Sequence, residues 1–489
     1  MGVLLGSLSF STVAAEVSFD EAWQLLQQNN NSLAAQRANV ERYGHLKDAS
    51  KSLNLPKVTV GANYTRLDQD VTLNGQQFAE SLSGLPDLSA IGAVPGLGQI
   101  ANALGGVTST LENKDIFSSS IRAVWPIFTG GRITAAQTAA EGKQDEARSQ
   151  LAMEVQARYE DLSKYYFSVI LAKNVVDTRM AVEKGLTKHR DFALKMEEQG
   201  QIARVERLQA EASLDKAVVE RKKAEHSLNI AQAALTQVLG QIEKVEPRDE
   251  LFINRTLPPL DAFIDQTLDT YPGLAILDAK EKQASSLIKA EKGKYYPEVY
   301  AYGDYSLYHG DSLTSQLKPD WLVGIGVSVP LLENSGRSEQ MKAAGSAVSQ
   351  VQFLRKQARQ DLSVLVEKTY LEAQQALDEV QGLNSSIKLA QENLKLRQKA
   401  FSQGLGRSLD VVDAELYLAS IKTQQDAASF QYLLSLNKLL ALSSEMNNFS
   451  SYKYNAITLP NYDLRMHHEQ GKTHFSYTRR RCRYWLGWL

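Results

Sequence analysis

Two very long stretches of the chain carry apolar residues at the three- and four-residue steps that keep them on one helix face. The first apolar series runs over 151–180 and the second over 348–365, with Gln, Glu, Lys and Arg on the opposite faces. This pattern is typical of a coiled-coil seam. It predicts helices at about 132–199 and 337–403, each roughly 100 Å long at 1.5 Å per residue.

Four shorter stretches alternate between apolar and small or polar residues, as Val58, Val60 and Tyr64 do against Thr59. A period of two predicts β-strands, and ~10-residue strands with aromatic residues near their ends fit a lipid-facing sheet. An amphipathic sheet of a soluble domain has the same pattern, but the flanking helices are too long to fold back over it. The expected strands are about 57–67, 116–126, 298–308 and 321–330.

The chain is an internal duplication, because three blocks recur in the same order with constant spacing. The first block recurs at an offset of 241 residues and the other two at 204, so the first copy carries an insertion of 37 residues. The paired blocks are 55–58 with 296–299, 125–128 with 329–332, and 199–211 with 403–415.

Each copy is expected to contain a helix, two strands and a long helical hairpin. The leading helices lie at about 32–53 and 273–292, and the return helices at about 205–239 and 408–442. The expected organisation is a first repeat (16–240, hairpin 132–239, loop insertion 68–115), a linker or equatorial segment (241–272), a second repeat (273–445, hairpin 337–442) and a C-terminal tail (446–489).

The N-terminus has a short apolar run followed by the small residues Val13, Ala14 and Ala15. This predicts a signal peptide over 1–15 whose basic n-region is truncated, since the first basic residue is Arg37. A frayed apolar end is the alternative. No stretch elsewhere has ~18 uninterrupted apolar residues, so any membrane-spanning part is expected to be a β-barrel.

Charge and residue usage argue against several classes of protein. Lys and Arg number 54 and Asp and Glu 56, so no nucleic-acid partner is indicated. A single cysteine, Cys482, excludes a disulfide framework and a cysteine-based metal site. No nucleophile and base occur together, so we expect no enzyme, cofactor or metal site. The histidines without metal-ligand spacing include His45, His189, His226 and His309.

Four strands cannot close a barrel, and open sheet edges are not tolerated in lipid. Small closed barrels have about eight strands. Three chains would supply twelve strands and twelve helical struts. The predicted fold is therefore mainly α with a membrane β part, assembled as a homotrimer with a 12-stranded β-barrel continued by a 12-helix α-barrel.

The duplicated motifs resemble the TolC-like outer-membrane efflux proteins over 16–445. The resemblance rests on LPxV at 55–58, YPxV at 296–299, PIFxGGR at 126–132, PLLxxxGR at 330–337, and SQG at 402–404 followed by LDVVDAE at 409–415. It implies a trimeric outer-membrane barrel, a tunnel through the periplasm, and docking to a periplasmic adaptor and an inner-membrane pump. The function implied is a passive conduit for drugs, small molecules or secreted polypeptide. The alternative is a soluble periplasmic coiled-coil structural protein.

The turns of the two helical hairpins are candidate docking sites. Glycine permits a tight reversal there, and the resemblance implies that these tips meet the adaptor. The alternative is that the glycines only turn the chain. The candidate residues are Gly200, Gln201, Ile202, Arg204, Gly404, Leu405 and Gly406.

Asp410 and Asp413 are candidates for a gate at the inner end of the tunnel. They lie three residues apart, hence on one helix face, where the first repeat has Glu206 and Gln209. Six carboxylates from three chains would select cations, and the resemblance implies that such aspartates line the closed aperture. The alternative is capping, with Ser408 as N-cap and Asp410 stabilised by the helix dipole.

Further candidates surround these elements. Arg407 could latch the closed gate by pairing with a neighbouring helix. Trp125 and Trp321, at strand ends, are expected at the membrane interface, or packed at the junction of sheet and helices. The insertion has no charged residue over 88–110 and is expected to be an extracellular loop, with disorder as the alternative. We expect no function for residues 461–489, whose composition departs from the family.

Overall fold

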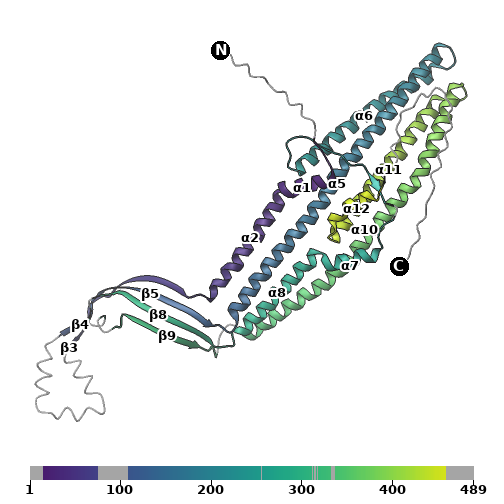
Figure 1. Cartoon of the computed structure of the whole chain (residues 1–489). Helices are drawn as coiled ribbons and strands as arrows, with labels where there is room; N and C mark the ends of the chain where they lie inside the picture. The colour runs from purple at the N-terminus through teal and green to yellow at the C-terminus, as the bar shows by residue number, and fades with distance from the viewer. Residues whose placement is uncertain are drawn as a thin grey trace, which may run out of the picture.

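The computed structural model describes residues 15–74, 108–254, 256–310, 312, 315, 318–331 and 336–458. The molecule is elongated, with a β-sheet at one end and the turns of two helical hairpins at the other (Figure 1). The predictions for the signal peptide, the uncharged segment 88–107 and the tail beyond 458 fall outside the described residues, apart from Ala15.

Four long helices form the two hairpins. The first hairpin consists of α5 (Arg132–Glu198) and α6 (Arg204–Val238), and the second of α10 (Arg337–Ser402) and α11 (Ser408–Leu442). These bounds lie within one residue of the ranges expected from the apolar periodicity. Within the described part of the chain, no helix has an apolar stretch long enough to cross a membrane.

Two shorter helices line the half of the hairpins that lies nearer to the sheet. The helix α2 (Asn31–Lys51) packs along α5, and α8 (Pro272–Gly293) packs against both α5 and α10. Asn30 starts α2 by accepting a hydrogen bond from the Leu33 amide through its side chain. A 3₁₀ turn, η1 (Ser52–Asn54), then leads into the first long strand.

The sheet has the strand order β2-β5-β8-β9 and is antiparallel throughout. Its strands are β2 (Lys57–Arg66), β5 (Asp115–Phe128), β8 (Glu298–His309) and β9 (Trp321–Ser328).

The register of this sheet shows the duplication directly. Val58 of β2 lies opposite Ala123 of β5, and Val299 of β8 lies opposite Val327 of β9. Adding 241 to Val58 and 204 to Ala123 gives the second pair, so the β8–β9 ladder repeats the β2–β5 ladder residue for residue.

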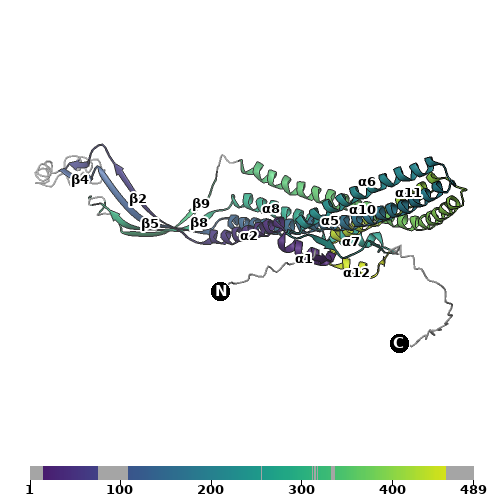
Figure 2. The same cartoon turned by 90° about the horizontal axis from the view of Figure 1, so that it is seen from above.

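No other element of the described chain covers the faces of this sheet, which extends away from the helices as a curved layer (Figure 2). Val323 is 75% exposed and Ile325 71% exposed, and every residue of β2 is exposed. The outer strands β2 and β9 each pair on one side only within the described chain. A single chain therefore leaves a large apolar surface and two open strand edges.

Part of the expected loop 68–115 is a second, two-stranded sheet. The strands β3 (Val71–Asn74) and β4 (Thr108–Glu112) pair antiparallel beyond the ends of β2 and β5. At the interruption between the two ladders, the Asp70 carboxylate accepts a hydrogen bond from the Lys114 amide at 2.7 Å. The loop expected from residue 68 onward is therefore wrong at both of its ends, because Asp70 bridges the gap and strand pairing resumes beyond it.

A hydrophobic core lies near the middle of the long helices, where short segments from both ends of the chain and from the linker meet. The helix α1 (Phe19–Asn29) begins with Ser18 and Glu21 in a reciprocal capping box. Phe19 contacts Tyr159, Tyr166, Phe167 and Phe449.

The remaining elements of this equatorial region surround the same core (Figure 1). Two very short ladders hold them: β1 with β6 in parallel and β7 with β10 in antiparallel. The bounds are β1 (Ala15–Val17), β6 (Val245–Pro247), β7 (Phe252–Ile253), α7 (Leu260–Thr270), η3 (Met446–Asn448), α12 (Phe449–Tyr454) and β10 (Ile457–Thr458).

Candidate functional site: the hairpin tips

The two hairpin turns have the same backbone design. Gly200 has φ +70° and Gly404 has φ +72°, in the left-handed region that favours glycine. The amide of the next residue then donates back to a carbonyl five residues earlier: Gln201 to Met196 at 2.8 Å and Leu405 to Ala400 at 3.0 Å. This is the Schellman pattern, which satisfies the last carbonyls of a helix.

The side chains at the two turns point differently. Ile202 is partly buried against a small cluster that contains Met196 and Phe401, whereas Leu405 is 80% exposed. Gln201 and Arg204 are exposed, and Gly406 packs close to the backbone of Phe401. Of the predicted docking residues, Leu405 therefore presents the largest apolar surface.

Asp410 holds the start of α11. Its carboxylate accepts from the Arg407 amide at 3.3 Å and lies 3.4 Å from the Arg407 guanidinium and 3.8 Å from that of Arg397 on α10. Arg407, not Ser408, is the N-cap residue, so the expectation of a serine cap is wrong. A guanidinium cannot accept a hydrogen bond, so the cap is made by Asp410 alone. Arg407 pairs with its own helix in the single chain.

Asp413 has no such role. It is exposed, and within the described chain no residue forms a hydrogen bond or ion pair with its carboxylate. Helix capping therefore accounts for Asp410 but leaves Asp413 without a structural task in the single chain.

Ser408 instead links the two hairpins. Its amide donates to Glu206 of α6 at 2.7 Å, and its buried hydroxyl lies 2.7 Å from His189 Nε2 of α5. Burial lowers the pKa of His189, against the opposing effects of Glu206 and Ser408. Ser408 is more than 200 positions from both His189 and Glu206 in sequence, so periodicity within one helix could not identify these contacts.

The two tryptophans occupy different settings. Trp125 donates from Nε1 to the Asn54 carbonyl at 2.8 Å, at the junction of sheet and helices. Trp321 is 63% exposed and lies opposite Tyr305. Both rings are exposed, Trp125 by 50%, so a place at the membrane interface stays a prediction for both tryptophans.

The described residues contain no group of three or more His, Cys, Asp or Glu side chains placed to hold a metal ion. The tips offer carboxylates, exposed apolar residues and a linked pair of hairpins. Exposed carboxylates can attract cations, and an exposed apolar side chain can be buried by a partner.

Comparison with known proteins shows that the sequence matches a known protein family. The sequence pattern of the family described as "Outer membrane efflux protein" matches residues 22–241 and 263–444. Outer membrane protein TolC of Vibrio cholerae is 21% identical over 343 residues, which cover 67% of this chain and 76% of that protein. Alkaline protease secretion protein AprF of Pseudomonas aeruginosa is 22% identical over 282 residues, covering 56% and 58%.

Solved structures share the fold at lower sequence identity. The outer-membrane channel OprN superposes with a TM-score of 0.70 at 14% identity, covering 87% of this chain and 90% of that one. CusC superposes with a TM-score of 0.69 at 14% identity, covering 89% and 95%. The MtrE outer membrane channel of Neisseria gonorrhoeae gives 0.68 at 18% identity, covering 88% and 90%.

Proposed function

The chain belongs to the outer membrane efflux protein family, and from that premise we propose that three copies form a passive conduit across the outer membrane. The conduit continues as a helical tunnel into the periplasm and carries drugs, small molecules or secreted polypeptide supplied by an inner-membrane pump. The observation that carries this proposal is a four-stranded sheet with exposed apolar faces and an open edge at each side.

The duplication supports a specific way of joining the copies. Within one chain β5 pairs on both sides, whereas its counterpart β9 pairs on one side only. On its second side β5 places Ala123 opposite Gly303 of β8. The offsets of 204 and 241 convert this pair into Val327 of β9 and Ala62 of β2. We therefore infer that Val327 of one copy faces Ala62 of the next.

This contact joins two different edges, so it is heterologous and closes only as a ring. Two copies would give eight strands, and barrels of that size are filled by their own side chains or hold one small ligand. Three copies give twelve strands and leave a lumen. A trimer is therefore the smallest closed assembly that suits a conduit.

Exposed apolar residues on two of the long helices also support a ring of copies. Leu208, Val219 and Ile230 are exposed on α6 at steps of eleven residues, which keep them on one helix face. Exposed Val364, Leu371, Leu389 and Leu396 form a similar row on α10. Inside the chain, α6 packs on α5 and α10 packs on α11, with α5 and α11 in contact between them. The two rows therefore lie on the outer helices of the four, where a neighbouring copy would cover them.

In this assembly we assign the gate to Asp410 and Asp413 and the docking of a periplasmic adaptor to the hairpin tips. The exposed, unpaired carboxylate of Asp413 supports the gate, because its charge is available to the lumen. The exposed Leu405 supports docking, because a partner could bury its side chain.

Two measurements test the proposed function. Purified protein in planar bilayers should show stepwise ion conductance, and outer-membrane pellets should contain heat-modifiable trimers. Recovery in the soluble periplasmic fraction without detergent, and with no conductance, would favour the coiled-coil structural protein instead.

A further inference from the structure

The contact between α5 and α11 is the seam that joins the two hairpins within one chain. The helices run antiparallel, and polar pairs cross the seam along its length. His189 meets Ser408 near the tip, Asn174 donates to Asp426 at 3.1 Å, and Tyr159 donates to Asn437 at 2.6 Å near the equatorial core. Opening this seam removes the packing that stabilises the facing turns of α5 and α11, so these turns unfold locally more often and their amides exchange with solvent.

Glu415 lies in this seam and is partly buried. Its carboxylate lies against Gly185 of α5, where an added Cβ would stand 2.6 Å from Oε1. The charges that face it are Lys188 of α5 and Lys422 of α11. Burial outweighs both cations and raises the pKa of Glu415 to about 7.

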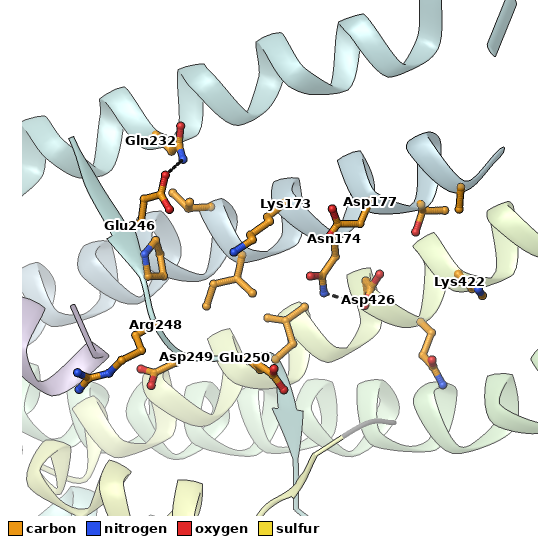
Figure 3. Close-up of a pocket in the computed structure, with 17 residues that line it drawn as sticks. Lys173, Asn174, Asp177, Gln232, Glu246, Arg248, Asp249, Glu250, Lys422 and Asp426 are labelled. Carbon is orange, nitrogen blue, oxygen red and sulfur yellow. Dashed lines mark hydrogen bonds between the residues drawn. The ribbon is translucent and has the colours of Figure 1, made fainter. Parts of the chain in front are cut away.

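Asp426 lies eleven residues further along α11, on the wall of a polar cavity of about 400 Å³ (Figure 3). Lys173 and Asp177 of α5 line the same cavity, together with residues 246–251 that follow α6. Burial and the nearby Asp177 raise the pKa of Asp426 to about 6, against the Asn174 hydrogen bond and Lys422. The cavity gives solvent a route to this carboxyl.

We propose that the α5–α11 seam is a pH-sensitive clasp, in which protonated Glu415 and Asp426 hold the two hairpins together and their ionised forms loosen them. Acid therefore favours the closed hairpins and neutral to alkaline pH favours their separation. The consequence for transport rests on the proposed function, because only in a tunnel would separation widen the inner end.

The sign follows from proton linkage. Both carboxyls bind protons more tightly in the closed seam than in solvent, so the closed seam is most stable in acid. That stability is lost as the pH rises through about 6 for Asp426 and about 7 for Glu415. His189 acts oppositely, because its lowered pKa disfavours the closed seam only at pH values below its ordinary 6.5. The carboxyls therefore dominate between pH 6 and pH 8.

Hydrogen exchange on the intact protein in detergent tests the clasp independently of transport. After correction for the intrinsic exchange rate, opening of the seam should be favoured about tenfold more at pH 8 than at pH 6 through Glu415, and about twofold more through Asp426. The readout is amide protection in 181–189 of α5 and 411–426 of α11.

Neutral variants separate the clasp from simple packing. Glu415→Gln should remove the tenfold change and Asp426→Asn the twofold change, with protection at pH 8 rising to the level seen at pH 6. The matched control is Glu211→Gln, at the equivalent position of α6 and outside the seam, which should keep the full pH response. Wild-type protection that does not fall between pH 6 and pH 8, or a Glu415→Gln variant that keeps the tenfold change, would overturn the proposal.

Conductance measured between pH 6 and pH 8 distinguishes a failure of the clasp proposal from a failure of the proposed channel function. A pH-dependent seam in a protein without conductance would contradict the proposed function and leave the clasp standing. A conducting protein with a pH-independent seam would contradict the clasp and leave the proposed function standing.

Discussion

The return helices of the two repeats, α6 and α11, have equal length but different surroundings. Each has 35 residues, yet α6 buries five of them and α11 buries eighteen. The two repeats form similar hairpins, but the packing of the single chain places α11 in its interior and α6 on its flank. In the proposed ring of three chains, a neighbouring copy would cover the exposed row on α6.

The first turns of α6 and α11 also differ, in the contacts and in the charge of their equivalent side chains. Glu206 of α6 reaches across to the Ser408 amide, whereas the equivalent Asp410 caps its own helix. The next pair, Gln209 and Asp413, differs in charge. The second repeat thus has two carboxylates at the start of its return helix, and the first repeat holds that helix through the hydrogen bond from the Ser408 amide to Glu206.

The largest contrast in stability is expected in the C-terminal third of the two helices. Leu433 of α11 is fully buried, and its equivalent on α6 is the exposed Asn229. Leu433→Ala should lower the free energy of unfolding by about 2–5 kcal/mol, because it leaves a cavity. Asn229→Ala should change it by less than about 0.5 kcal/mol. Thermal and denaturant unfolding measure both, and equal effects would refute the contrast in burial.

The turns should respond alike in stability. An added Cβ at Gly200 or Gly404 meets no atom within 4 Å, but tryptophan there must adopt a positive φ, which costs about 1–2 kcal/mol. Trimers should still reach the outer membrane, and export should fall if the tips dock an adaptor. Export assays with trimer quantification provide the measurement, and unchanged export would leave the glycines with a turning role only.

The smallest change in stability is expected at the gate. Asp410→Ala should cost about 0.3–1 kcal/mol through the lost cap, and Asp413→Ala close to nothing. Together they should lower cation selectivity and alter conductance in single-channel recordings. The matched control is Glu206→Gln, since Glu206 occupies the equivalent place in the first repeat. Unchanged selectivity with only a lower melting temperature would contradict the gate and leave the aspartates with a helix-capping role only.

Periodicity predicted the two longest helices and the four long strands because each signal extends over about ten or more residues, and the glycine turns of the two copies placed the return helices. The ladders of β1 with β6 and β7 with β10 span two or three residues, too few for any period, and they form only because the core brings distant segments together. The serine cap was wrong because the hydroxyl of Ser408 finds His189 across the seam. Glu415 ends the motif at 409–415, but nothing in that motif predicted that its carboxyl lies in the seam, since a glutamate in a helix is usually exposed.

The pairing of Val327 with Ala62 between copies is the most direct test of the assembly. Cysteines at both positions, with Cys482→Ser, should oxidise to a covalent trimer on denaturing gels. Pairing within one chain is excluded, because β2 and β9 stand three strand spacings apart, about 14 Å, and a disulfide needs Cα atoms within about 7 Å. The matched control pairs cysteine at Val327 with cysteine at Val60, two residues out of register, and should link poorly. A product that stops at the dimer, or uncrosslinked monomer under both pairings, would contradict the trimeric conduit.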